Sequence, residues 1–396
     1  MRGFTIGRIA GIKIRIDWTW LIIFFLVTWS LAVGYYPLAL PGLSTAAYWG
    51  LGAVSSLLLF GSVLGHELTH SLVARGEGLP VGSITLFVFG GVSEIQEEPR
   101  TASNEFRLAI VGPVSSLILG GIFFGIYLLL PARTPVTVVA QYLGIINLSL
   151  GVFNLIPGFP LDGGRVLRSL IWGATGNLRR ATRIATWVGQ GFAFFLIFVG
   201  IALLFGGAFL AGIWLAFIGW FLNNAATASY RELIVRQTLE GVPVRRVMAT
   251  DVDRLPPDLT IRQVIDEHIL SGRQHAYPVT RDGDLVGLIC LHDVRNVPQE
   301  RRIQETVAQA MTPYDRLATI GPEEDLSKAV NQLGRRGVDQ LPVIDRPQHL
   351  VGLVRRQDII NYLRTQTDLK NGDGGIAGRP DQQDLTDTGQ GSQGLG

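Results

Sequence analysis

The sequence predicts a polytopic α-helical membrane protein, with about six transmembrane helices and a small cytoplasm-side β element, followed by a soluble α+β pair of repeated domains. Three observations predict this fold class. Only 17% of the 396 residues are charged, against about 25% in an ordinary soluble chain. Two long runs, 18–65 and 184–230, contain no Asp, Glu, Lys or Arg. From Arg231 onward charged residues recur every few positions, so the membrane-embedded part, 1–230, ends there.

The number of crossings follows from the lengths of the uncharged runs. A helix rises about 1.5 Å per residue and the hydrocarbon core is about 30 Å thick, so one crossing takes about 20 residues. Each long run is long enough for two crossings, and two shorter runs, 108–132 and 134–161, allow one each. The sequence therefore predicts six helices, at about 18–36, 47–74, 105–130, 135–156, 184–205 and 209–229.

Basic residues in the connecting segments predict the orientation. Twelve of them fall on one side of the six helices, and Arg133 alone falls on the other. Lys and Arg accumulate in cytoplasmic loops, so we expect a multi-pass protein of the cell membrane with its N- and C-termini cytoplasmic. The lipid bilayer is therefore a partner. The positive charge reflects membrane topology, and no nucleic acid is expected to bind.

The second predicted helix ends in His66-Glu67-Leu68-Thr69-His70. Two histidines four residues apart lie on one helical face. Both imidazoles can bind one Zn²⁺ there, and Glu67 can act as general base on a water at the metal. Ionisable side chains are costly inside transmembrane helices and commonly mark function. The alternative is a polar pair hydrogen-bonded to neighbouring helices.

A catalytic zinc takes a third protein ligand and keeps one position open. The fourth predicted helix runs in the same direction as the second and brings 154–165 to the same depth. Asp162 is the sole acidic residue of 106–231 and is the predicted third ligand. Two prolines precede it, and Gly163-Gly164 permits a tight turn, so we expect Asp162 on irregular backbone that lines a cavity. The alternative is an ordinary turn residue.

These two motifs resemble the signatures of the site-2 proteases, a family of intramembrane zinc metalloproteases, and the resemblance covers residues 1–230. It implies one zinc ion per chain, bound by His66, His70 and Asp162. It also implies that Glu67 activates water and that Asn154 holds the scissile carbonyl or its oxyanion. For Asn154 the alternative is an amide that caps freed helix backbone. The implied substrate is a transmembrane protein.

Residues 81–95 are rich in β-branched and aromatic side chains, which predicts strand structure between the second and third helices. A sheet edge can take up an unwound substrate by strand addition, and glycine lets backbone approach closely. The family places substrate-facing strands here, so Phe89, Gly90 and Gly91 are candidate substrate-binding residues. A hairpin that only shields the zinc is the alternative. Residues 12–16 alternate strictly and are expected to join the same sheet.

Residues 242–364 contain an internal repeat with a period near 64 residues. Each unit reads as a helix, a strand, a turn, a second strand and a helix with Asp293 or Asp358 as its N-cap. The pattern is similar to a tandem pair of CBS domains, which often bind adenine nucleotides. We therefore predict a linker at 231–241, one CBS domain at 242–300, a second at 301–364, and a disordered tail at 365–396 that is dispensable for catalysis.

The nucleotide site departs from the pattern of nucleotide-binding CBS pairs. Those members carry a Ser or Thr three residues before an Asp that holds the ribose; here Asp293 and Asp358 are present, but the hydroxyl positions hold Cys290 and Arg355. Asp293, Asp358 and Arg355 are the candidate residues for ATP, ADP or AMP, with Arg355 facing phosphates. The alternatives are a homodimer formed through the module, which is the expected assembly, and a lid beneath the active site.

Together these features favour a zinc protease that cuts within the membrane and carries a regulatory module. The second interpretation is a transporter or channel regulated by the CBS pair, because such pairs are also attached to transport proteins. The sequence of the helices shows no obvious ion path, which weighs against this interpretation. A catalytically inactive membrane sensor is the third. The intact motif at 66–70 and Asp162 weigh against it.

Overall fold

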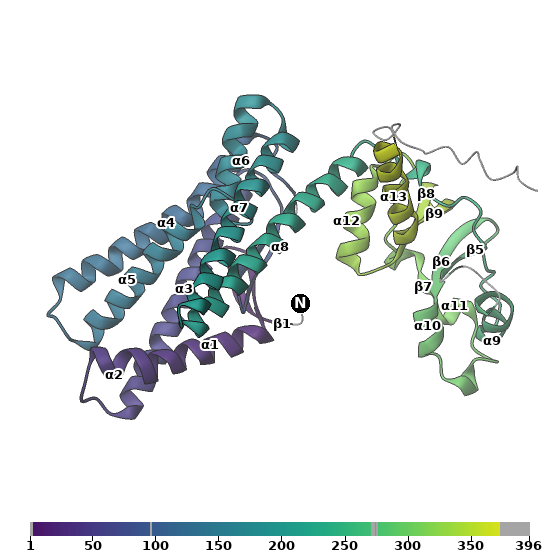
Figure 1. Ribbon diagram of the computed structural model, residues 1–396. Coiled ribbons are helices and arrows are strands. Elements are labelled where there is room, and N and C mark those ends of the chain that lie inside the picture. Colours follow the sequence, from purple (N-terminus) through teal and green to yellow (C-terminus); the bar gives the residue numbers. More distant parts are fainter. Residues whose placement is uncertain (1–2, 96, 271–273, 275, 373–396) are drawn as a thin grey trace, which may run out of the picture. The chain divides into compact units, whose positions relative to one another are not determined.

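The computed structural model describes residues 3–95, 97–270, 274 and 276–372 (Figure 1). The chain divides into two compact units, and the boundary in the sequence lies between Ile234 and Val235. Each unit is described by itself. The first unit is helical with one small sheet, and the second is built from strands and short helices. This agrees with the predicted fold class.

Six helices of the described residues are long and apolar enough to cross a membrane, as predicted. The first spans Trp18–Ala39 and consists of α1 (Trp18–Ser30), a π-helical turn and α2 (Tyr36–Ala39). The other five are α3 (Thr45–Gly76), α4 (Ala102–Leu129), α5 (Pro135–Asn154), α7 (Leu178–Phe205) and α8 (Phe209–Leu239).

Local capping explains where these helices begin. An oxygen of the residue before the first turn accepts a hydrogen bond from a backbone N–H that would otherwise have no partner. The caps of α1, α3, α4, α5 and α7 are Asp17, Ser44, Thr101, Thr134 and Asn177. Polar residues thus separate the apolar spans in the sequence and also start the helices.

A four-stranded sheet lies beside α3. Its strands are β1 (Gly3–Ile9), β2 (Ile12–Asp17), β3 (Val81–Phe87) and β4 (Gly90–Ile95), in the order β1-β2-β3-β4. The pair β2–β3 is parallel and the other two pairs are antiparallel, so the predicted strands at 12–16 and 81–95 do join one sheet. Strand β1 is missing from the prediction because it is mostly exposed and carries no alternating pattern.

The buried face of this sheet packs on α3 next to the histidine motif. Ile12, Ile14 and Ile84 form its core, and Leu64 and Leu68 of α3 pack against them. The sheet therefore holds the segment of α3 that contains the motif.

Helix α6 (Asp162–Thr175) corrects the prediction of irregular backbone and a tight turn after Asp162. A Cβ on Gly163 would lie 2.4 Å from the carbonyl carbon of Leu155, and a Cβ on Gly164 would lie 2.3 Å from that of Gly158. Both glycines are needed because the preceding turn folds directly against the first turn of α6. Packing of backbone on backbone thus overrides the low helix propensity of a Gly-Gly pair.

The second unit contains one sheet in the order β5-β6-β9-β8, with the short β7 added to β6. Its strands are β5 (Ala276–Arg281), β6 (Asp284–Cys290), β7 (Thr312–Pro313), β8 (Gln340–Arg346) and β9 (His349–Arg355). Its helices are α9 (Ile261–Gln263), α10 (Leu291–Asn296), α11 (Val307–Ala310), α12 (Leu326–Arg336) and α13 (Arg356–Gly372). The two β-hairpins, β5–β6 and β8–β9, are the predicted repeated strand pairs.

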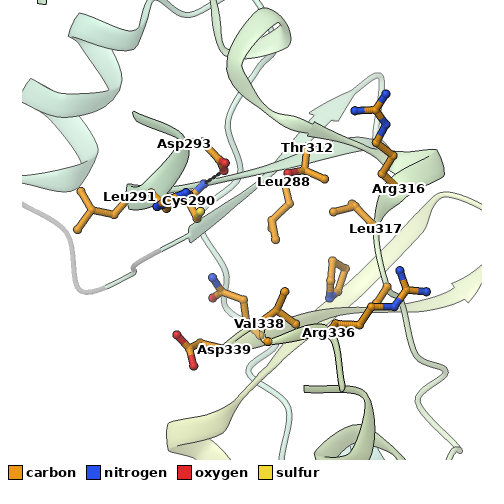
Figure 2. A pocket seen from close by; sticks show the side chains of 15 residues that line it. Leu288, Cys290, Leu291, Asp293, Thr312, Arg316, Leu317, Arg336, Val338 and Asp339 are labelled. Atoms are coloured by element: carbon orange, nitrogen blue, oxygen red, sulfur yellow. Dashed lines mark hydrogen bonds between the residues drawn. The ribbon is translucent and has the colours of Figure 1, made fainter. Parts of the chain in front are cut away.

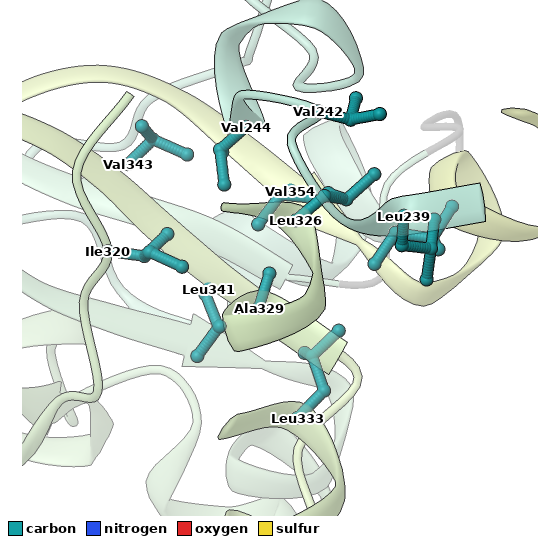
Figure 3. Close-up of a cluster of buried hydrophobic side chains, with 11 residues drawn as sticks. Leu239, Val242, Val244, Ile320, Leu326, Ala329, Leu333, Leu341, Val343 and Val354 are labelled. Atoms are coloured by element: carbon teal, nitrogen blue, oxygen red, sulfur yellow. The ribbon is translucent and has the colours of Figure 1, made fainter. Parts of the chain in front are cut away.

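Each repeat has its own hydrophobic core. The core of the second repeat joins α12, β8 and β9 to the chain just after α8, and Figure 3 shows Leu326, Leu341 and Val354 meeting inside it. The core of the first repeat contains Ile261, Tyr277 and Ile289, among others. Helix α13 continues to Gly372, so 365–372 is helical where a disordered tail was expected. The rest of that tail lies outside the described residues.

The two aspartates expected to be N-caps stand one turn further on. Helix α10 is capped by Cys290, and Asp293 is its third residue, whose carboxylate accepts a bond from the Cys290 backbone N–H at 2.9 Å. Asp358 likewise accepts from the Arg355 backbone N–H at 3.1 Å. A carboxylate at the third helical position that accepts a hydrogen bond from the cap residue is one half of a capping box. Such a residue stands three positions after the cap, so the two aspartates are not themselves the caps.

Candidate metal centre

Three ligand-type side chains converge where α3 meets the start of α6. The Nε2 atoms of His66 and His70 are 3.2 Å apart, and Asp162 Oδ2 lies 3.1 Å from the first and 3.2 Å from the second. Both histidines are buried. No other group of three or more His, Cys, Asp or Glu side chains with this proximity occurs among the described residues.

The spacing of these atoms suits one tetrahedral zinc ion. With metal–ligand distances of about 2.0–2.2 Å, adjacent ligands of a tetrahedral site stand roughly 3.3 Å apart. The three observed separations match one face of such a tetrahedron and leave its fourth corner open. A set of two imidazoles and one carboxylate is also a known catalytic zinc set.

The tautomer of His70 supports a cation at this point. Its Nδ1 lies 2.6 Å from the carbonyl oxygen of Leu108, which can only accept, so Nδ1 carries a proton. In the neutral ring Nε2 is then a bare lone pair that faces the Nε2 of His66 and a carboxylate oxygen. Two acceptors that lie 3.2 Å apart, His70 Nε2 and Asp162 Oδ2, repel each other unless a cation binds between them.

Helix α4 orients the two imidazoles from behind. Ser116 Oγ lies 2.9 Å from His66 Nδ1, and the Leu108 carbonyl holds His70. Between these positions stands Gly112, where a Cβ would lie 2.1 Å from His70 Nε2 and 2.8 Å from His66 Nε2. Outer contacts of this kind fix the ring orientation and tautomer of metal-binding histidines.

The same face of α4 also contacts helix α6, whose first residue is Asp162. Glu105 is fully buried and accepts from Arg168 Nε at 2.6 Å and from Arg168 Nη2. Positions 105, 108, 112 and 116 are spaced by three, four and four residues, so they lie along one helical stripe. One face of α4 therefore contacts both histidines and the helix that begins with the aspartate.

Glu67 is turned toward the sheet. Its Oε2 accepts a hydrogen bond of 2.7 Å from Ser93 of β4. Gly91 of the same strand lies so close that a Cβ there would be 2.5 Å from Glu67 Cγ. The glycine predicted to admit substrate backbone thus also makes room for the carboxylate of the motif.

The remaining candidates of the membrane half, Asn154, Phe89 and Gly90, make contacts of other kinds. Asn154 is the last residue of α5, and its Nδ2 donates to the Leu150 carbonyl at 3.0 Å, one turn back in the same helix. Phe89 and Gly90 form the tip of the β3–β4 hairpin. Phe89 stacks on Phe221 of α8 with ring centroids 4.6 Å apart, and Gly90 has φ +126°, a conformation that favours glycine.

In the second unit, Asp293 lines a cavity of about 650 Å³. Figure 2 shows Arg316 and Arg336 at one end of it and Asp293 and Asp339 toward the other, with apolar side chains such as Leu288 between them. The side chain of neither arginine forms a hydrogen bond or an ion pair with any residue that the structure describes. Burial raises the pKa of the Cys290 thiol, which also lines the cavity, so the thiol is neutral at pH 7.

The other two nucleotide candidates contact each other. Arg355 donates to Asp358 through Nε at 2.8 Å and through Nη2 at 3.0 Å, in a two-pronged ion pair. Both line a separate cleft of about 500 Å³. Arg355, which stands at the second hydroxyl position, is thus already hydrogen-bonded to the Asp358 carboxylate that would hold a ribose there.

Several residues that shape the metal centre are not among the residues predicted from the sequence: Glu105, Leu108, Gly112, Ser116 and Arg168 for the ligands, and Ser93 for Glu67. The first four share a helical stripe, which is a signal present in the sequence. That stripe is readable only when the helix is known to face the histidines, because small and polar residues in a transmembrane helix are otherwise explained by packing.

Both parts of the chain match known protein families. The model of peptidase family M50 matches residues 54–132 and 131–198, and the CBS domain model matches 244–300 and 307–365. A protein of Mycobacterium tuberculosis named zinc metalloprotease Rip3 is 37% identical over 362 residues, which cover 90% of this chain and 92% of that relative. The zinc metalloprotease MJ0392 of Methanocaldococcus jannaschii is 27% identical and covers 92% of this chain and 98% of its own length.

Among solved structures, the site-2 protease from Methanocaldococcus jannaschii is 30% identical, covers 57% of this chain and 94% of its own, and superposes with a TM-score of 0.42. The fold and the two matched models define a multi-pass membrane metalloprotease with a CBS pair. The chain belongs to peptidase family M50, the site-2 proteases, as its two motifs predicted.

Proposed function

We propose that this zinc metalloprotease hydrolyses a peptide bond within the transmembrane segment of a membrane-protein substrate. The observation that carries the proposal is the cluster of His66, His70 and Asp162. The metal-ligating atoms of these side chains lie 3.1–3.2 Å apart at the end of a membrane-spanning helix, and Glu67 lies on the same turn of that helix as the histidines. This arrangement would bring nucleophile and base to a peptide bond inside the membrane.

The proposed roles follow from this geometry. Zinc bound by the three ligands would supply Lewis-acid chemistry, which lowers the pKa of water and polarises a carbonyl. Glu67 takes the proton of the attacking water and returns it to the leaving amine. Asn154 is the proposed partner of the scissile carbonyl or its oxyanion, and its amide must leave the Leu150 carbonyl to act.

The substrate is proposed to bind as an added strand. A helical segment must unwind before hydrolysis, because its carbonyls are already hydrogen-bonded. Strand β4 is an edge of the described sheet and runs past Glu67, so a segment paired with it would pass the base. Phe89, Gly90 and Gly91 at the start of β4 would contact that segment.

The test uses the full chain in detergent with single-span test proteins. Wild type is expected to hold one zinc per chain and to cleave, Glu67→Gln to hold zinc without cleaving, and Asp162→Ala or His66→Ala to lose both. Normal cleavage by Glu67→Gln, or failure of every test protein with zinc-loaded wild type, would refute the proposal.

We also propose the domain boundaries and the orientation: a protease domain at 1–230, a linker at 231–241, CBS domains at 242–300 and 301–364, and both termini in the cytoplasm.

Homodimer formation through the CBS pair is proposed on its likeness to other such modules. Light scattering of the purified chain tests it, and a monomer at micromolar concentration would contradict it.

For the CBS pair we infer one adenine-nucleotide site, in the cavity with Arg316 and Arg336. Two guanidiniums without a partner among the described residues suit phosphates, the apolar centre suits a base, and Asp293 suits a ribose. The cleft of Arg355 and Asp358 is the poorer candidate because these side chains satisfy each other.

Titration of the full chain with ATP, ADP and AMP tests this site. One site per chain is expected, with affinity reduced at least tenfold by Arg316→Ala with Arg336→Ala, since hydrogen bonds to charged groups contribute about 1.5–3 kcal/mol. The exposed Arg346→Ala is the matched control. Absence of binding at millimolar nucleotide would remove the proposal.

A further inference from the structure

The hydroxyl of Ser93 on strand β4 hydrogen-bonds to helix α3. Its Oγ lies 2.7 Å from Glu67 Oε2 and 3.1 Å from the Glu67 carbonyl oxygen, and Ser71 Oγ donates to it at 3.1 Å. A serine hydroxyl has one proton to donate. The shorter contact assigns that proton to the carboxylate, and the donation from Ser71 fills an acceptor position of Ser93.

The strand also limits the carboxylate sterically. Residues two apart in a strand point to the same face, so Gly91 and Ser93 both face α3. A Cβ at Gly91 would be 2.5 Å from Glu67 Cγ and 3.3 Å from Glu67 Cδ. The Glu67 side chain thus packs against the backbone of Gly91 and is hydrogen-bonded to Ser93, both on the face of β4 that is turned toward α3.

Strand β4 pairs with β3 along one edge, through Leu86 opposite Gly91 and Ile84 opposite Ser93. No second strand among the described residues pairs with its outer edge. This outer edge is where the substrate is proposed to add. The strand that would receive the substrate is therefore the strand that contacts the base.

We propose that Ser93 is a positioning residue for the protease reaction, orienting the Glu67 carboxylate through its hydroxyl. Because Ser93 belongs to the proposed docking strand, one element fixes both the register of the substrate and the direction of the base. The inference rests on the proposed function. It adds that the hydroxyl acts on the chemical step and leaves zinc and substrate binding unchanged.

The test compares Ser93→Ala, Ser93→Thr and Ser83→Ala in the full chain. Ser83 is the matched control because it is a strand serine whose hydroxyl also donates to a carboxylate, that of Glu94 at 3.1 Å. Zinc per chain, kcat and KM are measured on a single-span test protein that wild type cleaves. Ser93→Ala is expected to keep its zinc and to lower kcat about 10- to 100-fold, with KM changed by less than about twofold.

Ser93→Thr keeps the hydroxyl and is expected to retain most of kcat, and Ser83→Ala to behave as wild type. Wild-type kcat in Ser93→Ala, loss of zinc, a change confined to KM, or an equal loss in Ser93→Thr would each overturn the proposal. If Ser93→Ala does not fold, Ser93→Cys, a weak donor of similar size, replaces it with the same expected result. Inactive Glu67→Gln beside normal Ser93→Ala would refute Ser93 alone, whereas active Glu67→Gln would refute the protease reaction itself.

Discussion

Gly112 sets how close α4 can come to the metal ligands. Replacing it with Ala places a Cβ 2.1 Å from His70 Nε2 and 2.8 Å from His66 Nε2, so the two imidazoles must move away from α4. We expect Gly112→Ala to lower zinc affinity by at least about 10- to 100-fold, as disturbed outer contacts of metal sites do. Zinc per chain after dialysis against a graded chelator measures this.

Gly121→Ala is the matched control, because it lies in the same helix and its Cβ would meet nothing within 4 Å. It should hold zinc as wild type does. Equal zinc affinity in the two variants would show that Gly112 does not contact the ligands.

The sequence identified the residues of the metal centre that have a distinctive chemistry. His66, His70 and Asp162 could be found because ionisable groups are rare in the membrane half. The groups that orient them could not be found this way, since a backbone carbonyl such as that of Leu108 occurs at every residue and a serine such as Ser116 fits many roles. Their function depends on which face of α4 meets α3, which is a tertiary fact.

At the scale of elements, the contact between α4 and α6 depends on a buried ion pair. Arg168→Met leaves Glu105 buried without its main partner, and breaking such a pair by removing one member costs about 3–5 kcal/mol. Unfolding of the variant in mixed detergent micelles is expected to show this loss. The double variant Glu105→Gln with Arg168→Met should recover most of it, because neither charge then remains buried.

An exposed pair in the same unit provides the comparison. Arg100 lies 3.9 Å from Glu97, and both side chains are exposed, so Arg100→Met should cost less than about 1 kcal/mol. A loss in Arg168→Met no larger than this would contradict the assigned role of the buried pair.

In the second unit, Asp325 caps α12 by accepting from the Ser327 N–H at 2.8 Å, and it also accepts from the Gly241 N–H. Burial raises the pKa of Asp325, but these hydrogen bonds lower it further than burial raises it, so the pKa lies below its usual value. Asp325→Ala is expected to cost about 1 kcal/mol, seen as about fivefold faster hydrogen exchange of α12 amides at pH 7.

The sign of the pH dependence follows from the lowered pKa. The carboxylate stabilises the fold above its unfolded pKa, and this contribution is lost as the pH falls through the folded pKa. Wild-type protection should therefore approach that of Asp325→Ala as the pH drops well below about 4. The exposed Asp315→Ala is the control, and equal exchange in the three proteins at pH 7 would contradict the capping role.

Elements with a strong periodic pattern were predictable, and those held by close packing were not. The six spans and the strands at 12–16 and 81–95 follow from composition and alternation. Helix α6 was missed because Gly163 and Gly164 disfavour a helix in isolation, and their reason for being there is the backbone of the turn before them. The capping aspartates were placed wrongly because Asp occurs at the third helical position as well as at the cap.

At the scale of the whole molecule, the basic residues predict which side of the membrane each loop faces. In a Cys290→Ser background, Ala132→Cys should react with a membrane-impermeant maleimide in intact cells, because the α4–α5 connection faces outward. Glu97→Cys should react only after permeabilisation. The opposite labelling pattern would invert the proposed orientation and place both termini outside.

The central claim is that a zinc centre in the first unit hydrolyses a peptide bond inside the membrane. Its most direct test is the mass of both fragments released from a single-span test protein by the full chain. The account predicts a cut within the transmembrane segment, near its cytoplasmic end, that disappears in Glu67→Gln although zinc is retained. A cut confined to the soluble part of the test protein, or an undiminished cut with Glu67→Gln, would contradict it.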